Sequence, residues 1–200
     1  MALGIDYFFA PQSPWTYLGH ARLVVMAEAA GATVQVLPVD LGRVFPVSGG
    51  LPLARRAPQR QAYRLVDLQR FGSFLGLPLV LQPRFFPVAG DDAARLIIAV
   101  DQADGASASL RLTGAVLAAV WAQERNIADP AVLAELLHET GLADLRLQEA
   151  RSAQVQARYD VQTQEAIDAG IFGAPTYRID GEMFWGQDRL DFVARKLAAA

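Results

Sequence analysis

Short apolar runs and helical spacings alternate along the first forty residues. Residues 5–9 form an aromatic-rich apolar run that predicts a central strand. Apolar residues then recur at helical spacing as far as Gly31, which is a typical helix end. Residues 33–37 alternate between polar and apolar side chains and predict a second strand. The order strand, helix, strand favours parallel pairing of the two strands.

The middle of the chain predicts helices separated by breaks. Residues 44–58 and 83–90 are rich in proline or glycine and predict irregular segments. The predicted helices span residues 58–75, 91–103, 110–124, 130–138 and 146–169. We therefore expect the middle of the chain to be all-helical.

The pattern returns to strands after Gly170. Residues 175–179 and 182–185 flank Asp180-Gly181, a pair that supplies the positive φ angles of a tight hairpin turn. A final amphipathic helix opens at Gly186-Gln187-Asp188. These elements would complete one sheet with the first three. We predict an α/β fold in which residues 1–42 and 170–200 form one domain and residues 43–169 are inserted as a helical domain.

The composition narrows the possible functions. The chain has 200 residues, of which 52% are hydrophobic and 20% charged, so it can bury a full core. Its formal net charge of -3 gives no general affinity for nucleic acid or an anionic membrane. It has no cysteine, which excludes cysteine nucleophiles and cysteine-based metal sites. We see no export signal and no apolar run of about 18 residues, so we expect a cytoplasmic protein without a membrane span.

Ser13 lies at the predicted turn from the first strand into the first helix. Thioredoxin-like oxidoreductases keep the first cysteine of a Cys-x-x-Cys pair at such a turn, and here the pair is Ser13 and Thr16. Disulfide chemistry is therefore excluded, whereas a helix N-terminus still favours an anion. Ser13 could donate a hydrogen bond to a thiolate or oxyanion, or it could be an ordinary helix cap.

A serine hydrolase is poorly supported. Serine is a weak nucleophile without an adjacent base, and the chain has only two histidines, His20 and His138. His20 follows Ser13 by about two helical turns, roughly 10 Å of rise, which is too far for direct contact. No Gly-x-Ser-x-Gly motif is present.

Two motifs near the C-terminus indicate a peptide-like ligand. Pro175 opens a predicted strand, where a cis bond to Ala174 would expose that backbone to an extended peptide; the alternative is an ordinary loop proline. Asp188 could bind an ammonium while N–H groups around Gln187 bind a carboxylate, or it could simply favour the helix N-terminus. The γ-glutamyl end of glutathione carries both groups.

Several segments together resemble the 2-hydroxychromene-2-carboxylate isomerases. They are residues 13–19 (SPWTYLG), 67–70 (DLQR), 86–87 (FP), 170–176 (GIFGAPT) and 184–191 (FWGQDRLD). That family is grouped with kappa-class glutathione transferases among DsbA-like thioredoxin folds. The resemblance covers almost the whole chain and implies a thioredoxin fold interrupted by a helical domain, a glutathione cofactor and a homodimer. It also implies interconversion of 2-hydroxychromene-2-carboxylate and trans-o-hydroxybenzylidenepyruvate in the breakdown of naphthalene-type aromatics.

The resemblance also assigns site residues. Ser13 would be catalytic, and the glutathione-binding residues would be Ser13, Ala174, Pro175, Gln187 and Asp188. The resemblance does not assign the residue for the substrate carboxylate: an arginine of the insertion could bind it, with Arg60, near Tyr63, the best placed, and Arg84, beside Phe85 and Phe86, a weaker candidate. Ala10 and Ala89 replace polar residues that many members carry, which bears on the substrate more than on glutathione.

Two other functions stay open at this point. The same cofactor site would serve a glutathione transferase or a thiol-dependent isomerase with another substrate. The other possibility is a non-catalytic thioredoxin-like module that binds a peptide at the sheet edge near Pro175.

Overall fold

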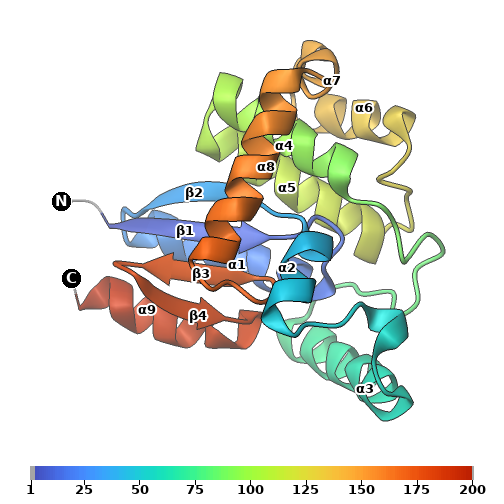
Figure 1. Ribbon diagram of the computed structural model, residues 1–200, viewed down its shortest axis with the longest axis vertical. Helices are drawn as coiled ribbons and strands as arrows, with labels where there is room; N and C mark the ends of the chain where they lie inside the picture. Colours follow the sequence, from blue (N-terminus) through green and yellow to red (C-terminus); the bar gives the residue numbers. More distant parts are fainter. Residues whose placement is uncertain (1–2, 200) are drawn as a thin grey trace.

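A mixed four-stranded sheet with helices on both faces forms the centre of the computed structural model, which describes residues 3–199 (Figure 1). Strand β1 (Gly4–Phe9) lies parallel to β2 (Thr33–Pro38) and antiparallel to β3 (Thr176–Ile179). Strand β4 (Glu182–Trp185) pairs antiparallel with β3, so the order is β2-β1-β3-β4. The parallel pair and the C-terminal hairpin predicted from the sequence are both confirmed.

Alternation along β1 directs its side chains into two apolar layers. Tyr7 belongs to the larger core cluster, together with residues of α1 (Pro14–Ala29) and α9 (Leu190–Ala198). Phe8 points the other way and packs with Ala166 of α8 (Ala153–Asp168). In Figure 1, α8 accordingly crosses the near face of the sheet, while α1 and α9 lie behind it.

The helical region lies between β2 and β3. Besides α8 it contains α2 (Leu41–Ser48), a 3-10 turn (Leu53–Arg55), α3 (Pro58–Leu75), α4 (Asp91–Asp104), α5 (Ala106–Trp121), α6 (Pro130–Glu139) and α7 (Leu145–Glu149). Helices α4 to α7 stand above the sheet in Figure 1, whereas α3 lies apart at the lower right. The inserted helices confirm the thioredoxin-like α/β fold with a helical insert.

Three of the predicted boundaries were wrong. Helix α2 occupies part of the segment 44–58 that we expected to be irregular, because Asp40 caps it by accepting the Gly42 N–H at 2.7 Å. Helix α5 starts four residues early, because Gly105 at φ 83° lets a new helix follow α4 at once. The expected helix 146–169 is two helices, because the Ser152 side chain accepts the Val155 N–H and starts α8 afresh.

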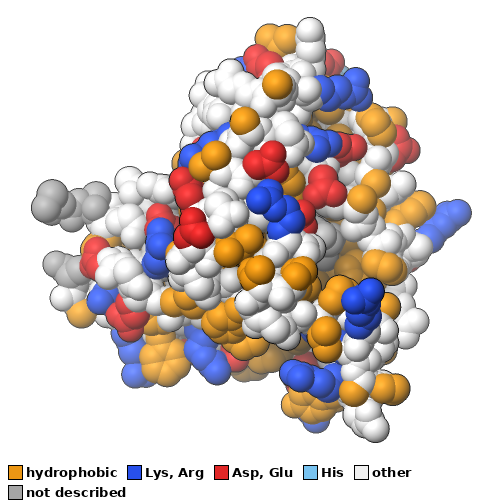
Figure 2. All heavy atoms as spheres, viewed as in Figure 1, with side chains coloured by type: hydrophobic (Ala, Val, Ile, Leu, Met, Phe, Trp, Pro, Cys, Tyr) orange, Lys and Arg blue, Asp and Glu red, His pale blue; other side chains and the backbone are white. Residues whose placement is uncertain are grey.

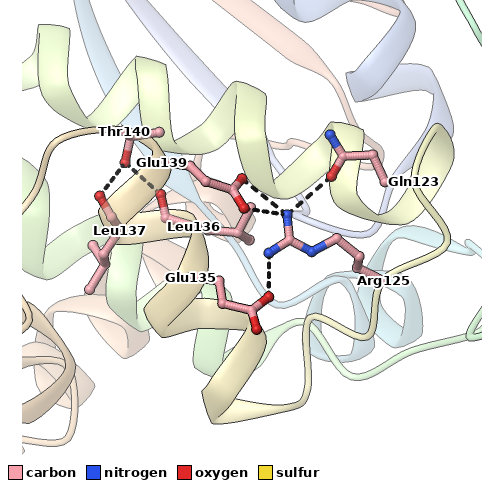
Figure 3. Close-up of polar contacts among 7 residues, drawn as sticks. All are labelled: Gln123, Arg125, Glu135, Leu136, Leu137, Glu139 and Thr140. Atoms are coloured by element: carbon pink, nitrogen blue, oxygen red, sulfur yellow. Dashed lines mark hydrogen bonds and ion pairs between the residues drawn. The ribbon is translucent and has the colours of Figure 1, made fainter.

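Arg125, in the loop after α5, forms hydrogen bonds with side chains of helix α6 (Figure 3). Its guanidinium donates to Glu135 at 2.7 Å, to Glu139 at 3.0 Å and to Gln123 at 3.2 Å. At the end of α6, the Thr140 hydroxyl lies within hydrogen-bond distance of two carbonyl oxygens of the last turn. This network is structural and lies in the helical region.

Within residues 3–199, the helices are all too short or too polar to cross a membrane. The same residues contain no group of three or more His, Cys, Asp or Glu side chains arranged to hold a metal ion.

Candidate active site

Ser13 caps helix α1 directly after the loop that leaves β1. Its hydroxyl oxygen accepts the Thr16 N–H at 3.2 Å, and its own N–H donates to the Ala10 carbonyl at 3.0 Å. The residue is 8% exposed. The predicted cap is confirmed, and it leaves the hydroxyl hydrogen of Ser13 free to donate.

The Ala174–Pro175 bond is cis, which confirms the hypothesis drawn from the sequence. The Pro175 carbonyl accepts the Gly186 N–H at 2.9 Å, which joins this loop to the start of the last turn. The hydrogen bonds within residues 3–199 include none to the backbone of Ala174. That backbone is therefore available to an added ligand strand.

The turn Gln187–Arg189 holds one buried amide and one exposed ion pair. Gln187 is 1% exposed; its side-chain and backbone oxygens both accept from Arg22 at 3.3 Å. In the described part of the chain its buried Nε2 has no hydrogen-bond partner. Asp188 pairs with Arg189 at 2.6 Å, and both side chains are about half exposed.

A cavity of about 630 Å³ separates α3 from this turn and from the start of α1. Its lining residues are Trp15, Arg56, Gln59, Arg60, Tyr63, Arg64, Asp67, Phe71, Ala174, Trp185, Gly186, Gln187, Asp188 and Arg189. Four of the predicted site residues therefore meet at one cavity: Arg60, Ala174, Gln187 and Asp188.

The other predicted site residues do not line the cavity. Ser13 lies two positions before the lining residue Trp15 in the sequence. Pro175 directly follows the lining residue Ala174. Arg84 lies elsewhere: its backbone N–H donates to Glu124 at 3.1 Å, and its guanidinium lies over the ring of Phe85.

The α3 side of the cavity is strongly basic. Within residues 3–199, Arg56, Arg60 and Arg64 have no ion pair, and Asp67 pairs with Arg70 outside the cavity at 3.4 Å. Burial lowers the pKa of Arg64 to about 10, with a further contribution from the charge of Arg56. In Figure 2, basic and apolar side chains lie next to one another over α3, at the lower right. The cavity therefore suits an anionic ligand with an apolar body.

Sequence reasoning missed Arg56, Arg64, Trp15 and Trp185 as cavity residues. Arg56, Arg60 and Arg64 recur every four residues, so the last two share one face of a helix. That spacing was the available signal for a basic helix face.

His20 is engaged elsewhere. Its Nδ1 lies 3.2 Å from the Tyr7 hydroxyl, and its Nε2 lies 2.9 Å from the Leu110 carbonyl oxygen. Burial lowers the pKa of His20 to about 4. His20 is thus a neutral core side chain and does not activate Ser13.

Comparison with known proteins decides the family. The sequence model of the DsbA-like thioredoxin domain matches residues 4–198. The chain belongs to the DsbA-like thioredoxin family.

Within the DsbA-like family, the resemblance to the 2-hydroxychromene-2-carboxylate isomerases is confirmed. The isomerase of that name from Pseudomonas putida is 33% identical over 192 residues, covering 93% of this chain and 90% of the relative. Another from Sphingobium xenophagum is 28% identical over 195 residues, covering 96% and 97%. A solved structure of a 2-hydroxychromene-2-carboxylate isomerase superposes with a TM-score of 0.81 at 30% identity, covering 98% of this chain and 95% of that one. These relatives support an isomerase.

Two proteins of lower sequence identity are also similar to this chain. A protein named glutathione S-transferase kappa 2 from Caenorhabditis elegans is 26% identical over 212 residues, covering 97% of this chain and 91% of the relative. The cytosolic disulfide reductase DsbM of Pseudomonas aeruginosa superposes with a TM-score of 0.72 at 20% identity, covering 99% and 100%.

Proposed function

We propose that this DsbA-like protein is a glutathione-dependent isomerase that interconverts 2-hydroxychromene-2-carboxylate and trans-o-hydroxybenzylidenepyruvate in the breakdown of naphthalene-type aromatics. The observation that carries the proposal is that Ala174, Gln187 and Asp188 line the same cavity as Arg56, Arg60 and Arg64, which have no acidic partner within residues 3–199. Relatives named for this isomerase reaction support the activity. A relative named as a kappa glutathione transferase supports the cofactor.

The residues present fit glutathione. Gln187 lines the cavity, and in the described part of the chain its buried Nε2 has no hydrogen-bond partner and the Ala174 backbone makes no hydrogen bond. Among the described residues, Arg189 is the one partner of the Asp188 carboxylate, and an exposed pair of this kind contributes about 0–1 kcal/mol. The carboxylate can therefore exchange its partner for a ligand ammonium. The residues that would hold glutathione are Ser13, Ala174, Pro175, Gln187 and Asp188.

Ser13 would hold a sulfur anion in its reactive state. When bound, glutathione would supply a thiolate that adds reversibly to the conjugated double bond of the substrate and so permits rotation about that bond. The Ser13 hydroxyl accepts the Thr16 N–H and keeps its own hydrogen for donation to the anion. The positive end of the α1 dipole acts in the same direction and favours negative charge at this point. Ser13 needs no general base for this role.

Arg60 would receive the substrate carboxylate from the α3 side. It lines the cavity and has no acidic partner within residues 3–199. A guanidinium can donate two parallel hydrogen bonds to a carboxylate and so orient it. Arg84 lies outside the cavity lining, and we do not extend the proposal to it.

The test is an isomerisation assay with and without glutathione. The ultraviolet spectrum of 2-hydroxychromene-2-carboxylate should shift to that of the product only when glutathione is present. Calorimetry should show glutathione binding that weakens at least about tenfold in Asp188→Ala, because a charged hydrogen bond is lost. Isomerisation that proceeds equally without glutathione would remove the cofactor from the proposal.

Two alternatives give different results in the same experiments. A kappa-like glutathione transferase, or a thiol-dependent isomerase with another substrate, would bind glutathione and leave the chromene unchanged. A non-catalytic binding module would bind no glutathione. The homodimer implied by the family is part of our proposal, and light scattering of the purified protein checks it.

The role of Ser13 has a matched control in the chain. Ser13 and Ser152 both cap helices by accepting an N–H at 3.2 Å, and only Ser13 stands next to the cavity residues. Ser13→Ala and Ser152→Ala should each lower stability by about 1 kcal/mol. Only Ser13→Ala should also lower kcat, by about 100-fold, as expected for loss of one preorganised donor. Equal kcat values in the two variants would assign Ser13 to capping alone.

A further inference from the structure

Arg64 is held by aromatic rings rather than by an anion. Its guanidinium carbon lies 5.2 Å from the centroid of Phe86 and 5.6 Å from that of Trp121. Trp121 is fully buried, and its ring packs against Phe86 at 4.8 Å. Two packed rings thus fix the orientation of this cation at the cavity wall.

The hydrogen-bond donors of Arg64 are unused. Within residues 3–199 its guanidinium makes no hydrogen bond or ion pair, and Nη2 is buried without a partner. A partly buried cation without a counterion is unfavourable, and the neighbouring charge of Arg56 makes it more so. An anion entering the cavity would relieve both effects. Arg60, by contrast, is exposed at the same wall.

The same indole connects Arg64 to the loop of Ser13. The Trp121 Nε1–H donates to the carbonyl of Gln12 at 3.3 Å, and Gln12 directly precedes Ser13. One rigid ring therefore stands between the guanidinium and the serine loop. A planar ligand held at both points would have its anionic end fixed relative to Ser13.

We propose that Arg64 determines specificity for an aromatic carboxylate: the carboxyl group that the exposed Arg60 first receives is then held by the half-buried Arg64 as a two-hydrogen-bond pair. This rests on the proposed function, because it names the group that positions the substrate of that reaction. The opposite wall, with Ala174 and Gln187, remains for glutathione. The aromatic-backed guanidinium therefore discriminates a carboxylate from an uncharged analogue of the same shape.

The test compares binding of trans-cinnamate with that of cinnamamide, measured by calorimetry on the full chain with saturating glutathione. The wild type should bind cinnamate at least about tenfold more tightly than cinnamamide, as a charge-assisted pair requires. Arg64→Met keeps the side-chain stem on the rings and should abolish the preference. Arg64→Lys keeps the charge without the planar fork and should restore part of it.

Arg70→Met is the matched control. Arg70 is on the same helix and also lies over an aromatic ring, that of the lining residue Tyr63, but Arg70 itself is not among the residues that line the cavity. This variant should keep the wild-type preference for cinnamate. Thermal melting verifies that each variant is folded.

Three results would overturn the proposal: no preference for cinnamate in the wild type, an undiminished preference in Arg64→Met, or a loss in Arg64→Met of glutathione affinity alone. Binding needs no turnover, so the two proposals fail separately. A preference for cinnamate that depends on Arg64, in a protein that leaves the chromene unchanged, would support the carboxylate subsite while refuting the isomerase.

Discussion

His20 shows how a buried side chain can carry a pH dependence without taking part in the chemistry. A carbonyl oxygen only accepts, so the contact with Leu110 places the hydrogen of the neutral ring on Nε2. Nδ1 is then the acceptor for the Tyr7 hydroxyl. Both ring nitrogens are satisfied in the neutral form, and burial lowers the pKa of His20 to about 4.

The depressed pKa of His20 predicts acid destabilisation. Between about pH 6.5 and pH 4 the unfolded chain binds a proton at His20 that the folded chain does not bind, so stability falls as the pH falls. The free energy of unfolding from urea titrations should drop by roughly 2 kcal/mol from this residue between pH 7.5 and pH 5.

The exposed second histidine provides the control. His20→Gln should lose this part of the pH dependence, and His138→Gln, which changes a side chain that is 65% exposed, should retain it. If His20→Gln has the same slope against pH as the wild type, the residue is not the source.

At the scale of elements, the contact between α1 and the Gln187–Arg189 turn joins the two halves of the proposed glutathione site. Gly19 permits this contact: a Cβ there would lie 2.7 Å from the Tyr177 hydroxyl and 2.9 Å from Gln187 Cβ. Both neighbours are buried, so neither can move freely. The helix that carries Ser13 therefore sets the position of Gln187.

Gly19→Ala should displace the turn from α1. We expect a loss of about 1–3 kcal/mol in the free energy of unfolding, typical of overpacking, together with weaker glutathione binding by calorimetry. Val25→Ala, at an exposed position of the same helix, should change neither by much. If Gly19→Ala lowers stability but leaves the glutathione affinity unchanged, then the close packing of α1 on the turn does not determine glutathione binding.

Most elements set by local signals were predictable from the sequence, although the caps at Asp40 and Ser152 were missed, and contacts between distant elements were not predictable. Ser13 and the Asp180-Gly181 turn, with φ of 50° and 80°, act within a few residues of themselves. Helix α2 contains Pro46 and reads as a break, yet it packs on α8 through Arg43 and Asp160 at 3.0 Å.

The candidate site likewise contains residues that local motifs indicate and a residue that depends on distant contacts. Ala174, Gln187 and Asp188 lie in contiguous motifs that the sequence singles out, and the structure places all three at the cavity. Arg64 was not found, because its rings, Phe86 and Trp121, are 22 and 57 positions further along the chain.

At the scale of the whole molecule, the sheet and the inserted helices share one core. Tyr7 of β1, Val36 of β2, Ile97 of α4 and Trp121 of α5 belong to the same buried cluster. Val193 of α9 belongs to it as well. No separate apolar core within residues 3–199 is confined to the helical insert. The predicted domain boundaries at residues 43 and 169 therefore mark segments of the sequence, and the hydrophobic core is continuous across them.

A shared core predicts one cooperative unfolding transition. Two single-tryptophan proteins, one keeping Trp121 in the insert and one keeping Trp185 on β4, should each report a single urea transition. Ile97→Ala, a cavity-forming change in the insert, should lower stability by about 2–5 kcal/mol in both. Because Trp185 lies across the sheet from the altered helix, its signal moves only if the two parts unfold together.

Val161→Ala on α8 is the control, since its side chain is 46% exposed, and it should shift neither midpoint by more than about 0.5 kcal/mol. A Trp185 midpoint that stays fixed while the Trp121 midpoint falls would mean that the insert unfolds on its own. In that event Arg64, whose aromatic support includes Trp121, would lose its place in the cavity before the sheet unfolds.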